Sequence, residues 1–515
     1  MVNNEVFVGA NAQVGLCPEL DLFFNSVDVD ATGLIYEHDL SASLVKLIPN
    51  LYIGCTVKID GLTSNDATSY RTITANTATT ITIDSPAVDS TGANLAGSDN
   101  VGDLTILSFG APAYGKVKSS TGTILSDNWV GLVNTFTPPN VEVEMKQLNL
   151  AAAGGRNLDY QYKGAETVSG GSLDLSLNNG SWLYYALGKI SSIAGGSTAQ
   201  NADHSNSLNG FGYHLSNKQI VRVIGQNIYP EIASSNVFLG HTNINYSTGG
   251  SWTYTFAEAD DDVLPSFALD VAYRKSNQSN TSVVDSNTPN ENLYSVIYTG
   301  CQVNSLTLNF EEGQELKSSV ELVTRRAFDA PDGYLPLRGQ VGLAGLDDSS
   351  NDAGGVGNYS TTLADNYPFL FSDGLIKLFG QTMARVKGGS LTISNNLTPQ
   401  RFIGNYNRQI TSAHLPGQRT YEVTLTMLIT DTKLWDEMRS ENESTGVLQL
   451  KFEKSGGEKI DIQLSDYTIN SVTIPFPEDK GAIEVEVAAT ARTLTSATYK
   501  GKWAIQTLGG TATGN

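Results

Sequence analysis

Tyr294-Ser-Val-Ile-Tyr-Thr-Gly-Cys-Gln-Val-Asn-Ser-Leu-Thr-Leu-Asn-Phe310 is the stretch that decides the fold, because the chain carries a second version of it. The second version is Asp461-Ile-Gln-Leu-Ser-Asp-Tyr-Thr-Ile-Asn-Ser-Val-Thr-Ile-Pro-Phe476. The closest match sets Val303-Asn-Ser-Leu-Thr-Leu-Asn-Phe310 over Ile469-Asn-Ser-Val-Thr-Ile-Pro-Phe476, aliphatic over aliphatic and Phe over Phe. Alternation of Val, Ile and Thr with polar residues is typical of β-strands. The repeat therefore predicts one strand in two equivalent places.

The order of elements around this motif also repeats. In each half, two alternating strands precede a short helix that carries a tryptophan, and the motif and a final strand follow. The segments are 141–150, 172–177 and 178–190 in the first half, and 389–394, 419–428 and 430–438 in the second. The final strands end at Thr324-Arg325 and Ala491-Arg492. This shared order favours a duplication, and predicts a mainly β protein with two tandem β-sandwich modules, each with one short helix.

The length and the composition along the chain predict several domains. A chain of 515 residues is too long for one ordinary core. The predicted parts are a small β-rich domain at 1–125, a first module at 126–328 with a Ser/Gly/Asn-rich insertion at about 191–251, a Gly/Asp/Ser-rich linker at 329–366, and a second module with the C-terminal tail at 367–515. Within the insertion, 218–224 is the one predicted strand.

The N-terminal part has its own strand pattern. The segment 51–60 alternates, with the inward face predicted to carry Ile53, Cys55, Val57 and Ile59. The segment 70–84 holds two Thr/Ile runs around a turn at 75–78, which is typical of a hairpin. Short strands at this spacing predict a small sandwich or barrel.

The charge balance argues against one class of function. The chain has 53 acidic and 32 basic residues, which gives a net charge of -21, and only 17% of its residues are charged. A protein that reads a nucleic-acid sequence needs a basic footprint, which this composition does not supply. An acidic surface repels DNA or keeps the protein soluble.

Cysteine usage and the N-terminus indicate a protein made and folded in a cytoplasm. Cys17, Cys55 and Cys301 lie far apart and form no CxxC pair, so we expect reduced and buried thiols. The first residues, Met-Val-Asn-Asn-Glu-Val-Phe, lack the basic and apolar regions of a signal peptide. No apolar run approaches the ~20 residues needed to span a bilayer, so no membrane partner is expected.

Two further stretches carry a resemblance to a known family. Tyr162-Lys-Gly-Ala-Glu-Thr-Val-Ser-Gly-Gly-Ser-Leu-Asp-Leu-Ser-Leu177 with its Trp-Leu helix resembles the tail tube proteins of tailed bacteriophages and related archaeal viruses, and so does Thr420-Tyr-Glu-Val-Thr-Leu-Thr-Met427 with Asp431-Thr-Lys-Leu-Trp435. The resemblance covers about 126–328 and 367–497. It implies a structural virion protein of the viral tail, without enzymatic activity or a cofactor. The small N-terminal domain is expected to decorate the outside.

The resemblance also implies an assembly. In that family, hairpins from six sandwiches close a ring around a lumen, and stacked rings carry the viral DNA without sequence-specific binding. Other tail proteins, namely terminator, baseplate and tape measure proteins, are the implied partners. With two sandwiches per chain, three chains suffice for a ring, so we expect a pseudo-sixfold trimer. The loops Arg156–Gly171 and Gly404–Gln418 occupy equivalent places in the two modules and are candidate contacts between rings.

Few residues suggest chemistry. Asp28, Asp30, Thr32 and Asp39 have the spacing of a calcium loop, but Asp39 stands where the usual bidentate Glu is found, and a polar turn is the alternative. The acidic run Glu258–Asp262 is a second cation candidate, against a solvated loop. The five histidines are scattered, and the adjacent Asp203-His204-Ser205 does not define a triad.

Two alternative functions remain open from the residues alone. Within the same class, the chain is another tail, baseplate or decoration component. From a different class, it is a tail spike that binds or cleaves carbohydrate, for which Trp182-Leu-Tyr-Tyr185 is a candidate sugar platform. At helical spacing, however, such aromatics are more often core residues. Hollow tubes or rings distinguish the first function from a compact, glycan-binding trimer.

Overall fold

The computed structural model describes the residues in the following ranges: 7–19, 22–38, 45–46, 50–60, 68–77, 79–88, 94, 101–107, 109–110, 116–117, 131–149, 160–195, 209–214, 219–224, 227–229, 237–240, 251–259, 263–275, 293–329, 367–383, 385–402, 411, 413–429, 433–440, 446–475 and 481–501. These residues form mainly β-structure with short helices, which confirms the prediction of a mainly β protein. The predicted linker, apart from Asp329, and the tail beyond Gly501 lie outside the described residues.

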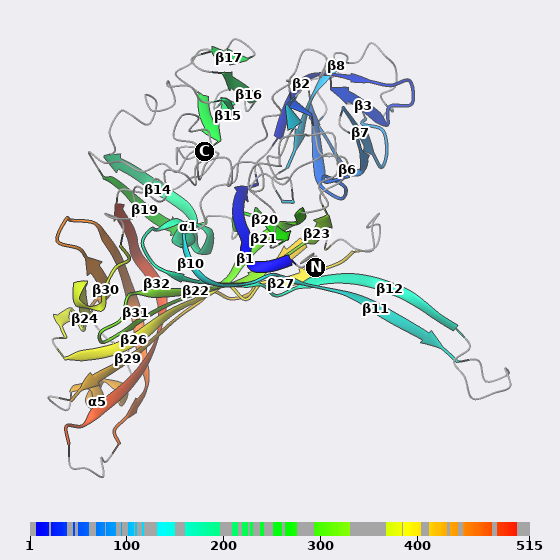
Figure 1. Ribbon diagram of the computed structural model, residues 1–515. Helices are drawn as coiled ribbons and strands as arrows, with labels where there is room; N and C mark the ends of the chain where they lie inside the picture. Colours follow the sequence, from blue (N-terminus) through cyan, green and yellow to red (C-terminus); the bar gives the residue numbers. More distant parts are fainter. Residues whose placement is uncertain are drawn as a thin grey trace, which may run out of the picture.

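The largest sheet has 16 strands and runs through both halves of the chain (Figure 1). Its members are β1 (Phe7–Pro18), β10 (Leu132–Thr137), β13 (Ser172–Ser176), β14 (Gly188–Gly195), β19 (Trp252–Glu258), β20 (Phe267–Lys275), β21 (Leu293–Glu311), β22 (Lys317–Val323), β23 (Arg326–Asp329), β24 (Gly374–Leu378), β25 (Gln381–Thr382), β26 (Val386–Ser394), β29 (Thr420–Leu428), β30 (Leu448–Glu453), β31 (Lys459–Thr473) and β32 (Glu484–Gly501).

Two sets of four strands follow each other in this sheet. The path reads β10-β13-β22-β21 and continues β26-β29-β32-β31. In each set, the two strands of a hairpin come first, then the strand that follows the repeated motif in the chain, then the strand of the motif itself. All of these neighbours are antiparallel. Both copies of the quoted motif are therefore strands, and they hold the same place in their sets.

Interruptions of the register also match between the two sets. The pairing register of the first strand in each set shifts once, between Val133 and Thr135 in β10 and between Val386 and Gly388 in β26. The motif strand slips where Asn304 and Asn470 stand, between Val303 and Ser305 in β21 and between Ile469 and Ser471 in β31. A β-bulge adds one unpaired residue and bends its strand.

Long bent strands explain why one continuous sheet forms instead of two separate sandwiches. β21 has 19 residues; its first part pairs with β20 and β23, and its second part pairs with β22 and β26. β31 divides in the same way, with β30 beside its first part only. The two parts of each motif strand thus have different neighbouring strands. Buried aliphatic and aromatic side chains of both halves form one hydrophobic core.

One short helix accompanies each set. α1 (Ser181–Leu187) contacts β21, and α5 (Lys433–Met438) contacts β31. α1 ends at Gly188, whose φ of 103° is the left-handed conformation common after helices. Ile190, which we expected in this helix, lies in β14. In α5, Leu434 is buried but Trp435 is 42% exposed. Trp435 is thus turned partly toward solvent, because successive helical residues point about 100° apart.

The small N-terminal sheet has ten strands. Its members are β2 (Leu22–Val29), β3 (Ile35–His38), β5 (Thr56–Asp60), β6 (Ser69–Asn76), β7 (Thr80–Ile83), β8 (Val101–Ile106), β15 (Asn209–His214), β16 (Gln219–Ile224), β17 (Asn227–Tyr229) and β18 (Val237–Gly240). Cys55, Val57 and Ile59 are buried as predicted, whereas Ile53 is half-buried in the turn before β5. The predicted hairpin is β6–β7.

In two respects the strand pairing differs from the expected division of the chain. β1 pairs with β20 in the large sheet, although it lies within the predicted domain 1–125. The insertion 191–251 holds four strands, β15 to β18, where one was predicted, and β16 joins them to β2. Side-chain alternation identifies half-buried strands, but it does not reveal which sheet a strand joins.

Three pairs of strands stand outside these sheets. They are β11 (Asn140–Leu148) with β12 (Tyr160–Ser169), β27 (Thr398–Gln400) with β28 (Ala413–Leu415), and β4 (Val45–Lys46) with β9 (Lys116–Val117). Figure 1 shows β11 and β12 as a long arm that leaves the body of the molecule. One 3-10 turn, η4 (Phe371–Asp373), precedes β24. No helix among the described residues is long and apolar enough to cross a membrane.

Candidate assembly surfaces

The two strand sets meet at a seam between β21 and β26. Seven residue pairs form this ladder, from Ser305↔Ser394 to Glu311↔Gly388. Thr307 and Thr392 face each other with their hydroxyl oxygens 3.0 Å apart. The aliphatic side chains along the seam are all buried, namely Leu306, Leu308, Leu391 and Ile393. The seam is therefore a continuous antiparallel β-ladder with one buried apolar face.

At the two ends of the eight-strand path, the described strands leave one side unpaired. β10 pairs with β13 and with no other described strand. Residues 465–473 of β31 pair with β32 on one side, and β30 reaches only to Leu464 on the other. Phe136 on β10 is half-buried, and Ile474, just beyond β31, is 41% exposed. Unpaired edges offer backbone N–H and C=O groups to another strand.

An open hollow of about 620 Å³ lies at one end of the seam. Its charged lining comprises Glu311, Glu312, Glu315, Lys317, Lys387 and Glu484. Lys387 Nζ lies 2.5 Å from Glu484 Oε1 and so ties β26 to β32. The hollow has no nucleophile–base pair, and its charged groups sit on strand ends and on the turn between β21 and β22.

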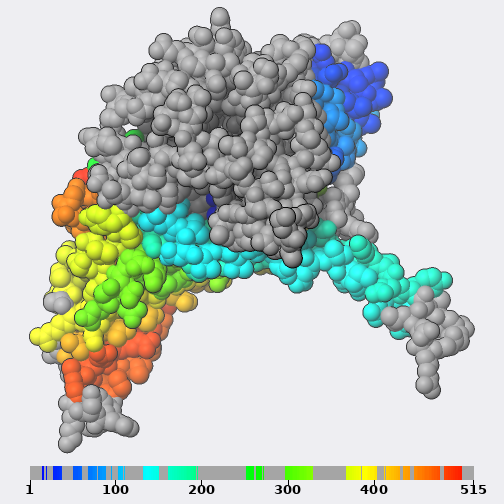
Figure 2. Space-filling model, viewed as in Figure 1, coloured from blue at the N-terminus to red at the C-terminus, as the bar shows by residue number. Residues whose placement is uncertain are grey.

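The arm continues the β10–β13 hairpin. Thr137 pairs with Ser172 and, past two prolines, Asn140 pairs with Ser169, so no residue is gained or lost at the break. A Cβ on Gly171 would lie 2.9 Å from Pro139 Cγ, so the base of the arm needs glycine there, at a φ of +102°. Figure 2 shows the arm standing clear of the body.

Every residue of β11 is exposed, including several large apolar side chains. Val141, Val143 and Met145 alternate along the strand and so share one face. Tyr160 and Tyr162 of β12 are more than half exposed. An isolated two-stranded hairpin is at best marginally stable in water, so this apolar face is suited to burial against another molecule.

Neither of the two predicted ring-contact loops is a simple loop. In the first, Arg156–Gly171, residues 160–169 are strand β12. In the second, Gly404–Gln418, residues 413–415 are strand β28. The expectation that they occupy equivalent places agrees with the topology, since β11–β12 lies between β10 and β13, and β27–β28 lies between β26 and β29. Arg401, after β27, donates from Nη2 to the carbonyl of Glu166 in the arm.

A buried carboxylate joins the small domain to the large sheet. Glu19 follows β1 and accepts hydrogen bonds from Gly110 N (2.7 Å), Ser266 Oγ (2.5 Å) and Gly300 N (2.7 Å). Burial raises the pKa of Glu19 to about 7, although these three donors and Arg325 favour the charged form. No sequence pattern signals this contact, because its partners are distant along the chain.

Arg325 lies in the same junction and is almost fully buried. Its Nε donates to Thr411 O (3.1 Å), its Nη1 donates to Cys55 Sγ (3.4 Å), and its guanidinium lies 5.2 Å from the Phe109 ring centroid. Cys55 in turn donates to Gly110 O (2.8 Å). The Arg325 side chain, which belongs to the first half, therefore contacts both the small domain and the second half of the chain.

His414 closes this junction from strand β28. Its Nδ1 lies 2.9 Å from Gln302 Oε1, and its ring meets Phe109 edge-on. Burial, with Arg325 nearby, lowers the pKa of His414 to about 4. His414 thus lies on a strand inside the segment 404–418 that was predicted to be a loop, and its neutral ring is a structural contact at pH 7. Cys55 and Cys301 are free and buried, as expected, and the side chain of Cys17 lies outside the described residues.

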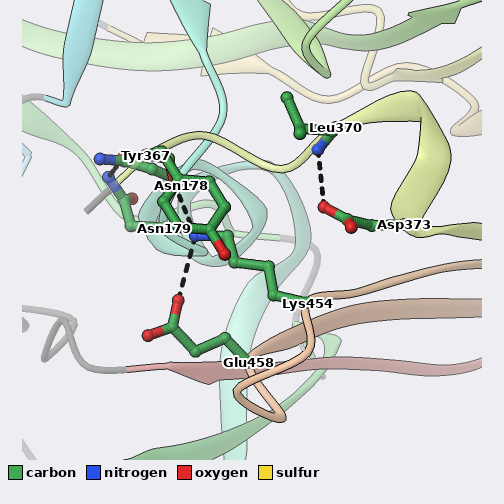
Figure 3. Close-up of polar contacts among 7 residues, drawn as sticks. All are labelled: Asn178, Asn179, Tyr367, Leu370, Asp373, Lys454 and Glu458. Atoms are coloured by element: carbon green, nitrogen blue, oxygen red, sulfur yellow. Dashed lines mark hydrogen bonds and ion pairs between the residues drawn. The ribbon is translucent and has the colours of Figure 1, made fainter. Parts of the chain in front are cut away.

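A buried lysine holds the chain where it enters the second half (Figure 3). Lys454 Nζ donates to Tyr367 O (2.5 Å) and to Glu458 Oε2 (3.0 Å). The ammonium also lies 4.5 Å from the Tyr367 ring centroid and 4.6 Å from that of Phe369. Phe369 N donates to Leu177 O (2.9 Å) in the first half. These contacts fix the start of the second half against the first.

The candidate calcium residues hold a turn. Asp30 Oδ2 accepts from Thr32 Oγ1 (2.6 Å), and Asp30 Oδ1 accepts from Leu34 N (3.0 Å) and Ile35 N (2.9 Å). The Thr32 hydroxyl is the largest cause that lowers the pKa of Asp30. Asp28 is exposed on β2, and Asp39 lies outside the described residues. The part of the chain that is described contains no group of three or more His, Cys, Asp or Glu placed for a metal.

The remaining candidates for chemistry are accounted for by packing. Glu258 ends β19 and accepts from the Tyr421 hydroxyl, while Asp260 to Asp262 lie outside the described residues. Burial first, and then Glu258, raises the pKa of Tyr421. Trp182 and Tyr185 are buried and pack on Phe267, so the aromatic cluster of α1 is core. His204 and His241 lie outside the described residues.

Comparison with known proteins identifies the class. The family model described as "Phage tail tube protein" matches residues 114–491, well over half of the chain. The chain belongs to the phage tail tube protein family. It is a structural subunit of the tail tube and is located in the virion tail. No curated protein matches the chain.

Two similar solved structures come from gene transfer agent particles. One is the tail of an empty particle, computed with helical refinement in C6 symmetry, and the other is the virion of the native particle. Their chains share 14% and 15% sequence identity with this one, at a TM-score of 0.17 in both cases. Each match covers 24% of this chain and 95% of the matched chain.

Proposed function

We propose that three copies of this chain close one ring of the tail tube, and that stacked rings form the conduit through which viral DNA passes. The repeated strand order carries this proposal. β10-β13-β22-β21 and β26-β29-β32-β31 are two copies of one module, with their bulges in the same places. A ring of six modules then needs three chains.

The seam between β21 and β26 is the model for how modules join. Within the chain it links the last strand of one module to the first strand of the next. If β31 of one chain pairs with β10 of the next chain in the same way, no sheet edge in the ring stays unpaired. Closure of a sheet removes edges that otherwise invite aggregation.

The arm and the short hairpin are the proposed contacts between rings. Both extend the first hairpin of a module, and the arm presents the exposed face of Val141, Val143 and Met145. A ring of three chains carries three long arms and three short hairpins, so neighbouring rings meet with threefold symmetry. Terminator, baseplate and tape measure proteins are the proposed partners at the ends and in the lumen of the tube.

We propose module boundaries that follow the strand pairing. β1 belongs to the first module because it pairs with β20, as β24 pairs with β30 in the second. The small sheet, from β2 to β8, is then inserted between β1 and β10 and decorates the outside of the tube with β15 to β18. The buried contacts of Glu19 and Arg325 fix its orientation. No residue is assigned to catalysis, and DNA passes without sequence-specific contacts.

Electron microscopy of the purified protein tests the function. The expected product is hollow tubes or stacked rings that form from the single chain. Compact particles that bind or degrade glycans, with no tubes at any protein concentration, would instead identify a tail spike.

A further inference from the structure

The internal seam shows which backbone groups face across it. At its two ends, Glu312 N donates to Lys387 O (2.9 Å) and Asn395 N donates to Asn304 O (2.8 Å). Partners in an antiparallel ladder alternate between hydrogen-bonded and non-hydrogen-bonded pairs. Counting in steps of two from Asn304 and Asn395 reaches the pair Leu308↔Leu391. The N–H of Leu391 therefore points across the seam.

The open edge of β10 carries the same positions. Val133 precedes the bulge in β10 as Val386 precedes the bulge in β26. Counting onward from the two bulges sets Pro138 in the place of Leu391. The next residue, Pro139, takes the place of Thr392, whose backbone faces the other way, toward Glu422 in β29.

Proline has no backbone N–H. Pro138 therefore removes a hydrogen bond from the outer edge, at a position where the internal seam keeps it. Pro139 removes one from the inner side and so interrupts the ladder at the base of the arm. Prolines on edge strands are a known means by which proteins avoid unwanted pairing. The adjacent prolines thus act on opposite sides of one strand.

The opposite edge belongs to β31. The repeated motif sets Ile474 in the place of Leu308, and Val472 in the place of Leu306. Val472 is buried, but Ile474 is 41% exposed although its counterpart Leu308 is 3% exposed. Val141 at the start of the arm is 42% exposed. Both edges therefore retain apolar side chains that a strand in the register of the internal seam would cover.

We propose that the edge formed by β10 and the start of β11 pairs with the edge of β31 in a second copy of this chain, and that Pro138 keeps this seam weaker than the internal one. The inference rests on the ring proposed above. In the register of the internal seam, the partners across the chains are Ser471 with Val141, Val472 with Asn140, and Ile474 with Pro138. One missing hydrogen bond per seam leaves single copies apart in solution until stacking on the tube aligns them.

Two matched substitutions test the role of Pro138. P138L introduces the residue of the internal seam and restores the N–H on the outer side. P139T does the same at the next residue, where the N–H faces the inner side. Because one hydrogen bond contributes a factor of about five, P138L is expected to lower the concentration at which copies associate about fivefold per seam. P139T is expected to associate like the wild type in sedimentation velocity. Equal behaviour of the two variants would overturn the role of Pro138.

Cysteine pairing tests the register in assembled tubes with both prolines intact. V141C/S471C is expected to give disulfide-linked chains on a non-reducing gel. V141C/T473C, shifted by one pair along the same face, is expected to give far fewer. Tubes without a V141C/S471C link, or with equal links in both variants, would overturn this seam and leave the tube function standing. If the wild type forms neither tubes nor rings, the proposed function itself fails.

Discussion

Thr307 and Thr392 hold their hydroxyl oxygens 3.0 Å apart across the seam between β21 and β26. The two residues are 85 positions apart in the chain, and the contact joins the two strand sets of the large sheet. They are a non-hydrogen-bonded pair, in which side chains approach most closely. A disulfide engineered between these two positions therefore tests the seam directly.

T307C/T392C is expected to form a disulfide within one chain. The closed loop is long, so the oxidised form gains up to about 4 kcal/mol in the free energy of unfolding. Urea unfolding with and without reductant measures the gain, and T307C alone is the control. Disulfide-linked dimers in place of an internal bond would contradict the seam.

Glu19 predicts a pH dependence of stability. Its pKa is about 7 in the folded chain against 4.5 for an ordinary glutamate side chain in water. The folded state therefore holds a proton that the unfolded state has lost, and stability falls as the pH rises from 4.5 through 7. At 1.36 kcal/mol per unit, the upper limit is about 3 kcal/mol.

E19Q is expected to flatten this slope. The amide lowers the absolute stability, because its NH₂ must face the N–H of either Gly110 or Gly300, but it does not titrate. His414 acts in the opposite sense: its pKa of about 4 removes stability as the pH falls from 6.5 through 4. H414Q is thus the comparison for the acid side. Denaturant unfolding from pH 4 to 8 gives the slopes, and an unchanged slope in E19Q would contradict the assignment.

Gly300 is expected to tolerate no side chain. Its φ is +63°, and an added Cβ would lie 2.4 Å from Arg325 Cβ. Gly313 has a φ of +79°, and an added Cβ there would have no neighbouring atom within 4 Å. G313A therefore measures the cost of the backbone strain without a steric clash. We expect G313A to cost about 1 kcal/mol and G300A to cost at least about 3 kcal/mol in thermal unfolding. Equal costs would show that Arg325 is free to move.

Removing the arm is expected to separate folding from assembly. In the variant, Asn-Gly replaces residues 143–166, so that the paired residues Glu142 and Thr167 are joined by a two-residue turn while Asn140, Val141 and the buried Val168 stay in place. None of the described residues that the variant removes is buried, and the hydrogen bond from Arg401 to Glu166 is lost, so the thermal midpoint is expected to fall by no more than a few degrees. Tubes are expected to be absent by electron microscopy. Normal tubes from this variant would contradict the role of the arm in stacking.

Local pattern predicted the strands well. The alternation in 294–310, 389–394 and 420–428 depends on one buried face, and each is a strand of the large sheet. The duplicated motif predicted the two equivalent strands, since both β21 and β31 lie last in their sets. Such patterns are set by neighbouring residues and need no knowledge of distant partners.

Long-range pairing was beyond the same reasoning. β1 alternates like any strand, and only its partner β20 reveals that it belongs to the large sheet. The first strand of the arm was predicted within 141–150, but the second, Tyr160 to Ser169, was taken for a loop, because it follows a Gly-rich turn and buries only Val168. Glu19 accepts a hydrogen bond from Gly300 N, and Arg325 donates one to Cys55 Sγ. Each contact joins residues that are far apart in the chain, and no residue spacing encodes it.

The number of chains in one ring tests the central claim most directly. Cryo-electron microscopy of assembled tubes, reconstructed without imposed symmetry, measures it. We predict three chains per ring, with six strand sets around the lumen and three long arms alternating with three short hairpins. Six chains per ring, each with its own arm, would contradict the pairing of two modules in one chain with a sixfold ring.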